Sequence, residues 1–247
     1  MSKRKWRSHL VIPDVQSRPG VQNDHLRWIG NYIAEKRPDV LICIGDFSDM
    51  ISLNSYAVGK AESEGTRYID DMANAKESMN KLLDPVRKCR QYRPDMRMTL
   101  GNHEARIERE AQNNPKLIGK ISLDDLGYRE AGWRVHPFLE VATIDGVEFS
   151  HYFTTGVMGR PCSSAAAMLR QRHRSCVMGH VQKVDIAVHP NTQQMALMSG
   201  ICYLHDEPYL GPQGQATKRG IWVLHEVREG RFDLMSVSLG FLKRRYS

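Results

Sequence analysis

Five polar side chains that can bind metal ions each follow a short apolar stretch of the sequence. The stretches HLVIPD, VLICIGD and MRMTLGN end in two carboxylates and one amide, and two later apolar stretches run into histidines. The five residues are Asp14, Asp46, Asn102, His151 and His180. Oxygen and nitrogen donors in this mixture suit Mn, Fe, Zn or Mg. Neighbouring strands of an α/β protein deliver their carboxyl ends to one edge of the sheet, so we expect the five to converge there on a metal site.

Strands must position these side chains, and the first half of the chain alternates strand and helix patterns. Continuous apolar runs precede the first three candidates, as expected of buried strands. Apolar residues at helical spacing fill 23–36 and 69–90, and Pro85 is expected to interrupt the second helix. This alternation predicts a layered α/β fold.

The second half of the sequence favours β-hairpins. Alternating runs meet at Asp145-Gly146 and at Glu229-Gly230, and a third pair of runs occupies 184–200. Together the two halves predict an α/β fold with two mixed β-sheets packed as a sandwich and flanked by helices. We expect one domain over 1–247, with a helical and loop insertion around 52–95 whose polar part could border a substrate groove.

The composition is that of an ordinary globular protein, with 247 residues, 41% of them hydrophobic and 26% charged. No apolar run is long enough to span a bilayer, and the sequence starts without a signal-peptide pattern. The five cysteines are scattered singly, as expected of reduced thiols. These features predict a cytoplasmic protein that does not contact a membrane.

The formal net charge is +7, and the excess collects in the runs SKRKWR, RQRHR and LKRR. A basic surface of this kind could meet a polyanion, so nucleic acid is the expected partner. Solvated tails and helix faces are the alternative interpretation, and the aromatic interleaving expected of a single-strand platform is weak.

The motifs around these candidates resemble those of the calcineurin-like metallophosphoesterases. The resemblance spans residues 14–182 and rests on DVQ at 14–16, GDFSD at 45–49, GNHE at 101–104, His151 and GHVQ at 179–182. GDxxD and GNHE occurring together are specific. The resemblance implies a pair of mixed sheets flanked by helices, in a single metallophosphoesterase domain, and two divalent metal ions.

The resemblance also assigns roles to the metal ligands. Asp46 would bridge the two ions, and Asp14 would hold the first. The second ion would be completed by Asn102, His151 and His180. Two ions clamp a phosphoryl group and activate a water for in-line attack, without a covalent intermediate. His103 would protonate the leaving oxygen, and Asp49 would orient it.

Two glutamines depart from the family's pattern. The family's motifs are usually DxH and GHxH. In this chain the last histidine of each motif is replaced by glutamine, at Gln16 and Gln182. Both would face the first ion. A neutral amide oxygen is a harder ligand than imidazole nitrogen, so manganese is the expected ion, with Mg, Fe or Zn as alternatives. Either the first site is re-tuned or it has been abandoned.

A third departure concerns the substrate. Phosphoprotein phosphatases of the family carry Arg directly after GDxxD, where this chain has Met50. Together with the basic surface, this favours a phosphodiesterase or nuclease that acts on DNA or nucleotides. A phosphomonoesterase and a non-catalytic scaffold that retains the fold remain alternatives.

A few other polar residues give weaker indications of a role. Arg106 and Arg109 could reach a phosphate, but a solvated helix face is the favoured interpretation. The segment from His205 to Glu207 could line the mouth of the site.

Overall fold

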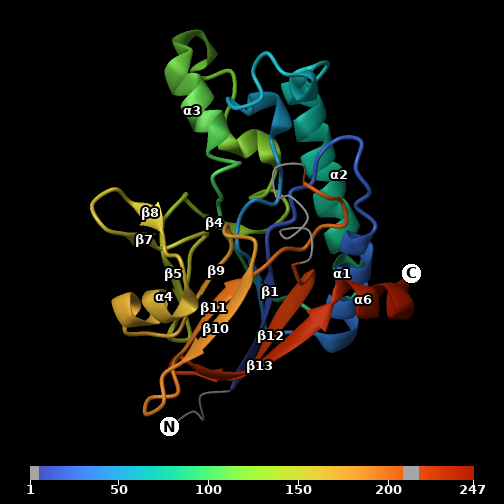
Figure 1. Cartoon of the computed structure of the whole chain (residues 1–247). Helices are drawn as coiled ribbons and strands as arrows, with labels where there is room; N and C mark the ends of the chain where they lie inside the picture. Colours follow the sequence, from blue (N-terminus) through green and yellow to red (C-terminus); the bar gives the residue numbers. More distant parts are fainter. Residues whose placement is uncertain (1–5, 208–216) are drawn as a thin grey trace.

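The computed structural model describes residues 6–207 and 217–247, which form two large β-sheets (Figure 1). The six-stranded sheet has the order β13-β12-β1-β2-β3-β4, and the five-stranded sheet has the order β10-β11-β9-β6-β5. Of the basic run SKRKWR, only the last two residues, Trp6 and Arg7, belong to the described part of the chain.

In the six-stranded sheet, β1 to β4 pair in parallel, and β12 pairs antiparallel with both β1 and β13. Its parallel strands are β1 (Arg7–Ile12), β2 (Val40–Cys43), β3 (Asp95–Thr99) and β4 (Arg134–His136). Its antiparallel part is the predicted hairpin of β12 (Gly220–Arg228) and β13 (Arg231–Ser238). The strands β1, β2 and β3 therefore end at one edge.

The five-stranded sheet contains the other two predicted hairpins. Its strands are β5 (Ala142–Ile144), β6 (Val147–Phe149), β9 (Cys176–Met178), β10 (Val184–Val188) and β11 (Met195–Ser199). The strands β6 and β9 run parallel. A separate small hairpin joins β7 (Thr154–Thr155) to β8 (Arg160–Pro161).

Helices cover the outer face of each sheet, and α3 projects beyond the strands at one end of the molecule (Figure 1). The helices of the described residues are α1 (His25–Lys36), α2 (Tyr68–Arg87), α3 (Arg106–Asn113), α4 (Ala165–Arg172) and α6 (Leu239–Tyr246). Short 3₁₀ turns lie at Ile51–Leu53, Ala61–Ser63, Pro115–Leu117 and Leu123–Leu126. In Figure 1, α1, α2 and α6 lie on one side of the molecule and α4 on the other.

The alternation of side chains along each strand builds three apolar cores. Val11 and Ile42 of the first sheet pack with Phe149 of the second, which forms the core between the sheets. Leu10 belongs to a core shared with α1, α2 and α6, and Met178 belongs to one shared with α4. The predicted fold, a sandwich of two mixed sheets flanked by helices, is confirmed. The assignment of 52–95 as an insertion stays a prediction.

The expected interruption at Pro85 is wrong, because α2 runs through it to Arg87. Proline near a helix end removes only one backbone hydrogen bond, and apolar burial can offset that loss. Leu82, Leu83 and Val86 are all buried in the core that α2 shares with α1. A Cβ at Gly30 of α1 would collide with the carbonyl of Leu82, so this glycine lets the two helices approach closely.

The described part of the chain contains no helix long and apolar enough to cross a membrane. The five cysteines are free thiols, in agreement with the expectation from their spacing.

A buried histidine at the start of α1 predicts a loss of stability in mild acid. Burial, followed by the charge of His205, lowers the pKa of His25 to about 3 from the ordinary 6.5. The native ring stays neutral while the unfolded chain takes up a proton below pH 6.5, so stability falls as the pH drops from 6.5 toward 3. By pH 5 the loss from this group is about 2 kcal/mol.

Urea unfolding at pH 7 and pH 5 measures this effect. The variant His25→Leu should lose less stability than the wild-type protein over the same range, since all other titrating groups are shared. Equal losses in the two proteins would show that His25 does not contribute.

Candidate active site

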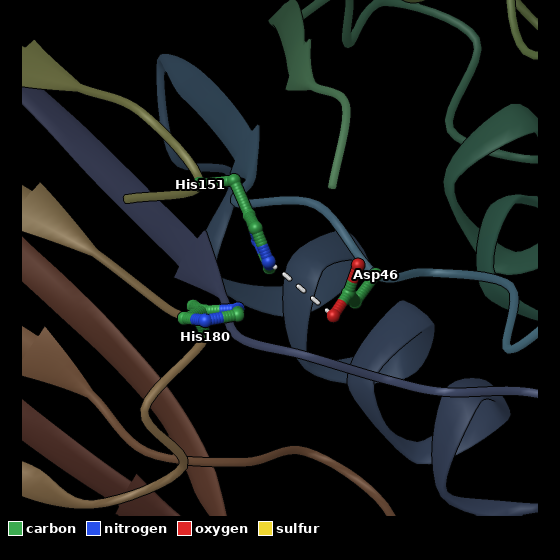
Figure 2. A group of neighbouring side chains, drawn as sticks. All are labelled: Asp46, His151 and His180. Carbon is green, nitrogen blue, oxygen red and sulfur yellow. Dashed lines mark ion pairs between the residues drawn. The ribbon is translucent and has the colours of Figure 1, made fainter. Parts of the chain in front are cut away.

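The five predicted strand-end residues lie together at one edge of the sandwich. Asp14, Asp46 and Asn102 follow β1, β2 and β3, and the two histidines follow β6 and β9. Figure 2 shows Asp46, His151 and His180 pointing toward one another from three separate segments. Their ligand atoms all lie within 4.8 Å of one another. The convergence predicted from the sequence is present in the structure.

The backbone at this edge is strained where the strands turn into loops. Asp46, His180, Gln16 and Gln182 have positive φ angles of 47°, 66°, 45° and 55°. Non-glycine residues seldom adopt this left-handed conformation, which costs on the order of 1–3 kcal/mol each. Four such positions at one edge point to a functional site, because surrounding structure must hold them there.

Two glycines allow the acidic side chains to approach the backbone. A Cβ at Gly101 would collide with the Asp46 carboxylate, and a Cβ at Gly179 would collide with that of Asp14. The carboxylate of Asp14 accepts from the backbone N–H of His180 at 3.0 Å. The glycines of the GNHE and GHVQ motifs are therefore needed for packing beside the carboxylates.

The donor atoms around Asp46 fit a divalent cation. The Nδ1 atom of His151 donates to the carbonyl of Ile44 at 2.9 Å, which directs Nε2 toward two oxygens. These are Oδ2 of Asp46 at 3.3 Å and Oδ1 of Asn102 at 2.9 Å. Nδ1 of His180 lies 2.8 Å from the same Asn102 oxygen. Lone pairs that converge in this way need positive charge between them.

Electrostatics agree with this donor set. Burial alone would lower the pKa of His151, but the charge and hydrogen bond of Asp46, together with Asp14 and the carbonyl of Ile44, raise it to about 9. Burial and the charge of His151 lower the pKa of His180 to about 4, which leaves its ring neutral and able to bind a metal. Burial raises the pKa of Asp14 to about 7. The charge of His151 opposes this rise, and the charge of Asp46 adds to it. The centre therefore stabilises added positive charge.

The two glutamines lie at the same edge, at different depths. Gln16 is fully buried, and its backbone N–H donates to the carbonyl of Asp46 at 2.8 Å. Gln182 lines a cavity above the site and accepts from the hydroxyl of Tyr203 at 3.2 Å. Asp14 does not belong to the group of three ligands around Asp46. The role of Asp14 and of both glutamines toward a first ion stays a prediction.

His103 lies beside the metal-binding residues, as predicted, with its ring held by Asp49. Its Nδ1 is 2.8 Å from Oδ1 and 2.9 Å from the carbonyl oxygen of Asp49. Its Nε2 lies 3.7 Å from Oδ2 of Asp46. Burial would lower the pKa of His103, but Asp46 and the bond to Asp49 raise it. The ring can thus carry a proton next to the place where the ions would sit.

Glu104 has a structural role that the sequence did not reveal. Its buried carboxylate accepts from the backbone N–H groups of Asp46, Phe47, Ser48 and Gly101 at 2.8–3.0 Å. These bonds tie the loop after β2 to the loop after β3. Glu104 therefore fixes the two segments that carry Asp46 and Asn102.

Two arginines lie at the site, and only Arg106 was among the residues that the sequence suggested. Arg18 donates to Oδ2 of Asp49 at 2.7 Å and to Glu207 at 3.0 Å. The favoured interpretation of Arg106 as solvated is wrong, since its side chain is only 12% exposed. It faces His103 and the loop after β2, because α3 begins directly behind the GNHE motif. Arg109, one turn further along α3, is exposed as expected.

A cavity of about 710 Å³ opens above these residues. One wall comes from the predicted groove loop, with Ile51, Asn54, Tyr56, Lys60 and Glu62. Of the segment from His205 to Glu207 that was predicted at the mouth of the site, Glu207 lines the cavity and the other two residues do not. Another cavity of similar size lies between α1, α6 and the β12–β13 hairpin, and it is mainly apolar. It does not include the residues that converge at the strand ends.

The two described basic runs do not border the site. RQRHR ends α4 and LKRR lies in α6, on different outer layers of the sandwich (Figure 1). None of their residues is among those that line the cavity above Asp46. The cationic side chains next to the site are instead Arg18, Lys60 and Arg106.

Comparison with known families defines the class of protein. The family model for calcineurin-like phosphoesterases matches residues 9–193. The chain therefore belongs to the calcineurin-like phosphoesterase family, a class of metal-dependent hydrolases that act on phosphoesters. Searches among curated proteins gave no match.

The chain also aligns with solved structures over almost its whole length. A dimetal phosphatase from Danio rerio aligns over 95% of this chain and 96% of its own, with 10% identity and a TM-score of 0.48. A conserved protein from Streptococcus pneumoniae, titled a predicted phosphoesterase, aligns over 94% and 98%, with 9% identity and a TM-score of 0.36.

Proposed function

We propose that this protein is a phosphodiesterase that cleaves nucleic acid or nucleotides and uses manganese. The observation that carries the proposal is the His103–Asp49 pair beside the ligands around Asp46. A scaffold that only retained the fold would have no need of a proton donor at this position. The basic runs lie elsewhere, so the argument for nucleic acid depends on the cavity wall.

The residues of the site divide the chemistry between them. When bound, the ions polarise the phosphoryl group and lower the pKa of a water. Asp46, Asn102, His151 and His180 would hold one ion, and Asp14, Gln16 and Gln182 would share the other with Asp46. As the water oxygen forms its bond to phosphorus, the bond to the leaving oxygen breaks. The leaving oxygen keeps the electron pair of the broken bond and accepts a proton from Nε2 of His103, and the attacking water releases its own proton to solvent.

The cavity suits a substrate larger than a phosphate ion. Its volume of about 710 Å³ lies in the range typical of small-ligand sites. Tyr56 is 81% exposed on the rim, and Lys60 of the same loop also lines the cavity. An exposed aromatic ring next to a cation can stack on a base and contact a neighbouring phosphate.

A substrate screen tests the proposal. After removal of metals, the protein is assayed with Mn, Mg or Zn on bis(p-nitrophenyl) phosphate, p-nitrophenyl phosphate and DNA. We expect the diester and DNA to be cleaved, fastest with Mn. A preference for the monoester would make the protein a phosphomonoesterase. Absence of turnover on every substrate, with ions bound, would support the scaffold alternative.

Replacement of Tyr56 tests the base-stacking role. Tyr56→Ala should lower kcat/KM on single-stranded DNA about tenfold, because stacking of one base on an aromatic ring contributes about 1–3 kcal/mol. Tyr56→Phe should retain the rate. Methyl p-nitrophenyl phosphate, which has no base, should be cleaved equally by all variants.

Val58→Ala is the matched control, since Val58 is exposed on the same loop but is not among the residues lining the cavity. If Tyr56→Ala and Val58→Ala reduce DNA cleavage equally, the loop matters only through its conformation.

A further inference from the structure

Arg106 is held at the cavity wall by backbone carbonyls. Its Nη1 donates to the carbonyl of Asp49 at 2.7 Å and to that of Met50 at 3.2 Å. Its Nη2 lies 3.3 Å from Nε2 of His103. Met50 has a φ of 53°, a left-handed turn that allows both carbonyls to face the guanidinium. The position of this cation is therefore fixed before any ligand arrives.

The charge of Arg106 is only partly compensated by its neighbours. Its ion pair is with Oδ1 of Asp49, 3.7 Å from Nη1 and beyond hydrogen-bond distance. That carboxylate already accepts from His103 at Oδ1 and from Arg18 at Oδ2. A mostly buried guanidinium bound chiefly to neutral carbonyls is costly unless an anion completes its environment. The cavity that Arg106 lines is the place from which such an anion can arrive.

We propose that Arg106 binds a non-bridging oxygen of the substrate's phosphoryl group, next to the leaving oxygen that His103 protonates. This inference rests on the proposed function. To transfer its proton, Nε2 of His103 must come within about 2.6–3.2 Å of the leaving oxygen. Nη2 of Arg106 is its neighbour at 3.3 Å, a spacing that two oxygens on one phosphorus can match. Guanidinium groups form strong charge-assisted hydrogen bonds with phosphate oxygens.

Arg106 could instead serve only to fix the loop after β2, and two variants separate these roles. Arg106→Gln keeps an amide that can donate to the carbonyl of Asp49 but removes the charge. Arg106→Ala removes both. A loop-fixing role predicts that glutamine restores function, whereas a phosphate-binding role predicts that it does not. Arg109→Ala is the control, since Arg109 is exposed on the same helix.

Two measurements on the Mn-loaded, full-length protein test the proposal. In calorimetry with inorganic phosphate, Arg106→Ala and Arg106→Gln should both bind at least about tenfold more weakly than the wild-type protein. In assays on bis(p-nitrophenyl) phosphate, both should lose about 10²-fold in kcat/KM, as expected for a lost donor to transition-state charge. Arg109→Ala should stay within about twofold of wild type in both.

The outcomes distinguish this inference from the proposed function. Phosphate affinity equal to wild type in Arg106→Gln, or recovery of the rate by glutamine alone, would overturn the role of Arg106. If Arg106→Ala proves unfolded in urea titrations, Arg106→Gln decides the question alone. If the wild-type protein binds phosphate through Arg106 but cleaves no diester, the proposed function fails while the role of Arg106 stands.

Discussion

The variant His103→Ala should lose about 10²–10⁴-fold of kcat on DNA while it retains its metal ions, because general acid catalysis typically contributes that much. The ring of His103 does not belong to the group of ligands around Asp46, so its removal leaves that donor set intact. Its Nδ1 is occupied by Asp49, and only Nε2 is oriented for proton transfer. The loss should appear in kcat, since protonation matters only as the leaving oxygen departs.

The leaving group provides a second readout for His103. A diester whose leaving group is a weak base needs little protonation, so the alanine variant should recover much of its rate on p-nitrophenyl esters and little on DNA. Metal content, measured by atomic absorption, should equal that of the wild-type protein. A loss of the same size on both substrates, or a loss of metal, would assign His103 a structural role instead.

The sequence was informative where function depends on the ends of strands. Asp14, Asp46 and Asn102 were identified because an apolar run stops directly before each, and the parallel order of β1, β2 and β3 brings them together. His103 and Asp49 were identified through motifs that are short and local. A strand end or a short motif is visible within a few consecutive residues, so its place in the site can be predicted from the local sequence.

Contacts between distant segments could not be predicted in this way. Arg18 meets Glu207 across 189 positions, and no pattern in the sequence indicates that these two residues pair. The prediction that Arg106 lies on a solvated face was wrong because α3 has few apolar residues, and a mostly polar helix sequence indicates exposure. The predicted interruption at Pro85 was wrong because apolar burial against α1 outweighs the backbone hydrogen bond that proline removes. The positions of the basic runs depended on which layer each helix covers.

The two glutamines should make the metal sites unequal. The site with Asp46, Asn102, His151 and His180 contains two imidazoles and should fill at low metal concentration. The other has Asp14, a share of Asp46 and two neutral amide oxygens, which bind borderline ions poorly. Titration with Mn or Zn should therefore show two separate binding steps. Activity should follow the weaker step, and Mn should support more activity than Zn.

Changing both glutamines to histidine should reverse this preference. The double variant Gln16→His and Gln182→His should tighten zinc binding at the weaker site by on the order of 100-fold, since even loss of an outer-shell partner costs 10–100-fold. Both positions have positive φ angles, a conformation in which histidine is comparatively frequent, so the backbone can accept the change. With one imidazole nitrogen at 182 on the zinc, the N–H of the other could donate to the hydroxyl oxygen of Tyr203, which now donates to Gln182.

Gln193→His is the matched control for this double variant. Gln193 also has a left-handed backbone, with a φ of 60°, but lies exposed between β10 and β11, away from the site. Calorimetry should show the affinity change in the double variant and not in the control. Two equal, tight zinc sites in the wild-type protein would contradict the effect assigned to the amides. The wild-type protein could instead bind one ion without turnover, while the double variant binds two ions and is active. That result would mean that the wild-type protein no longer binds the first ion. In that case the wild-type protein would be a scaffold, and Gln16 and Gln182 alone would account for its lack of activity.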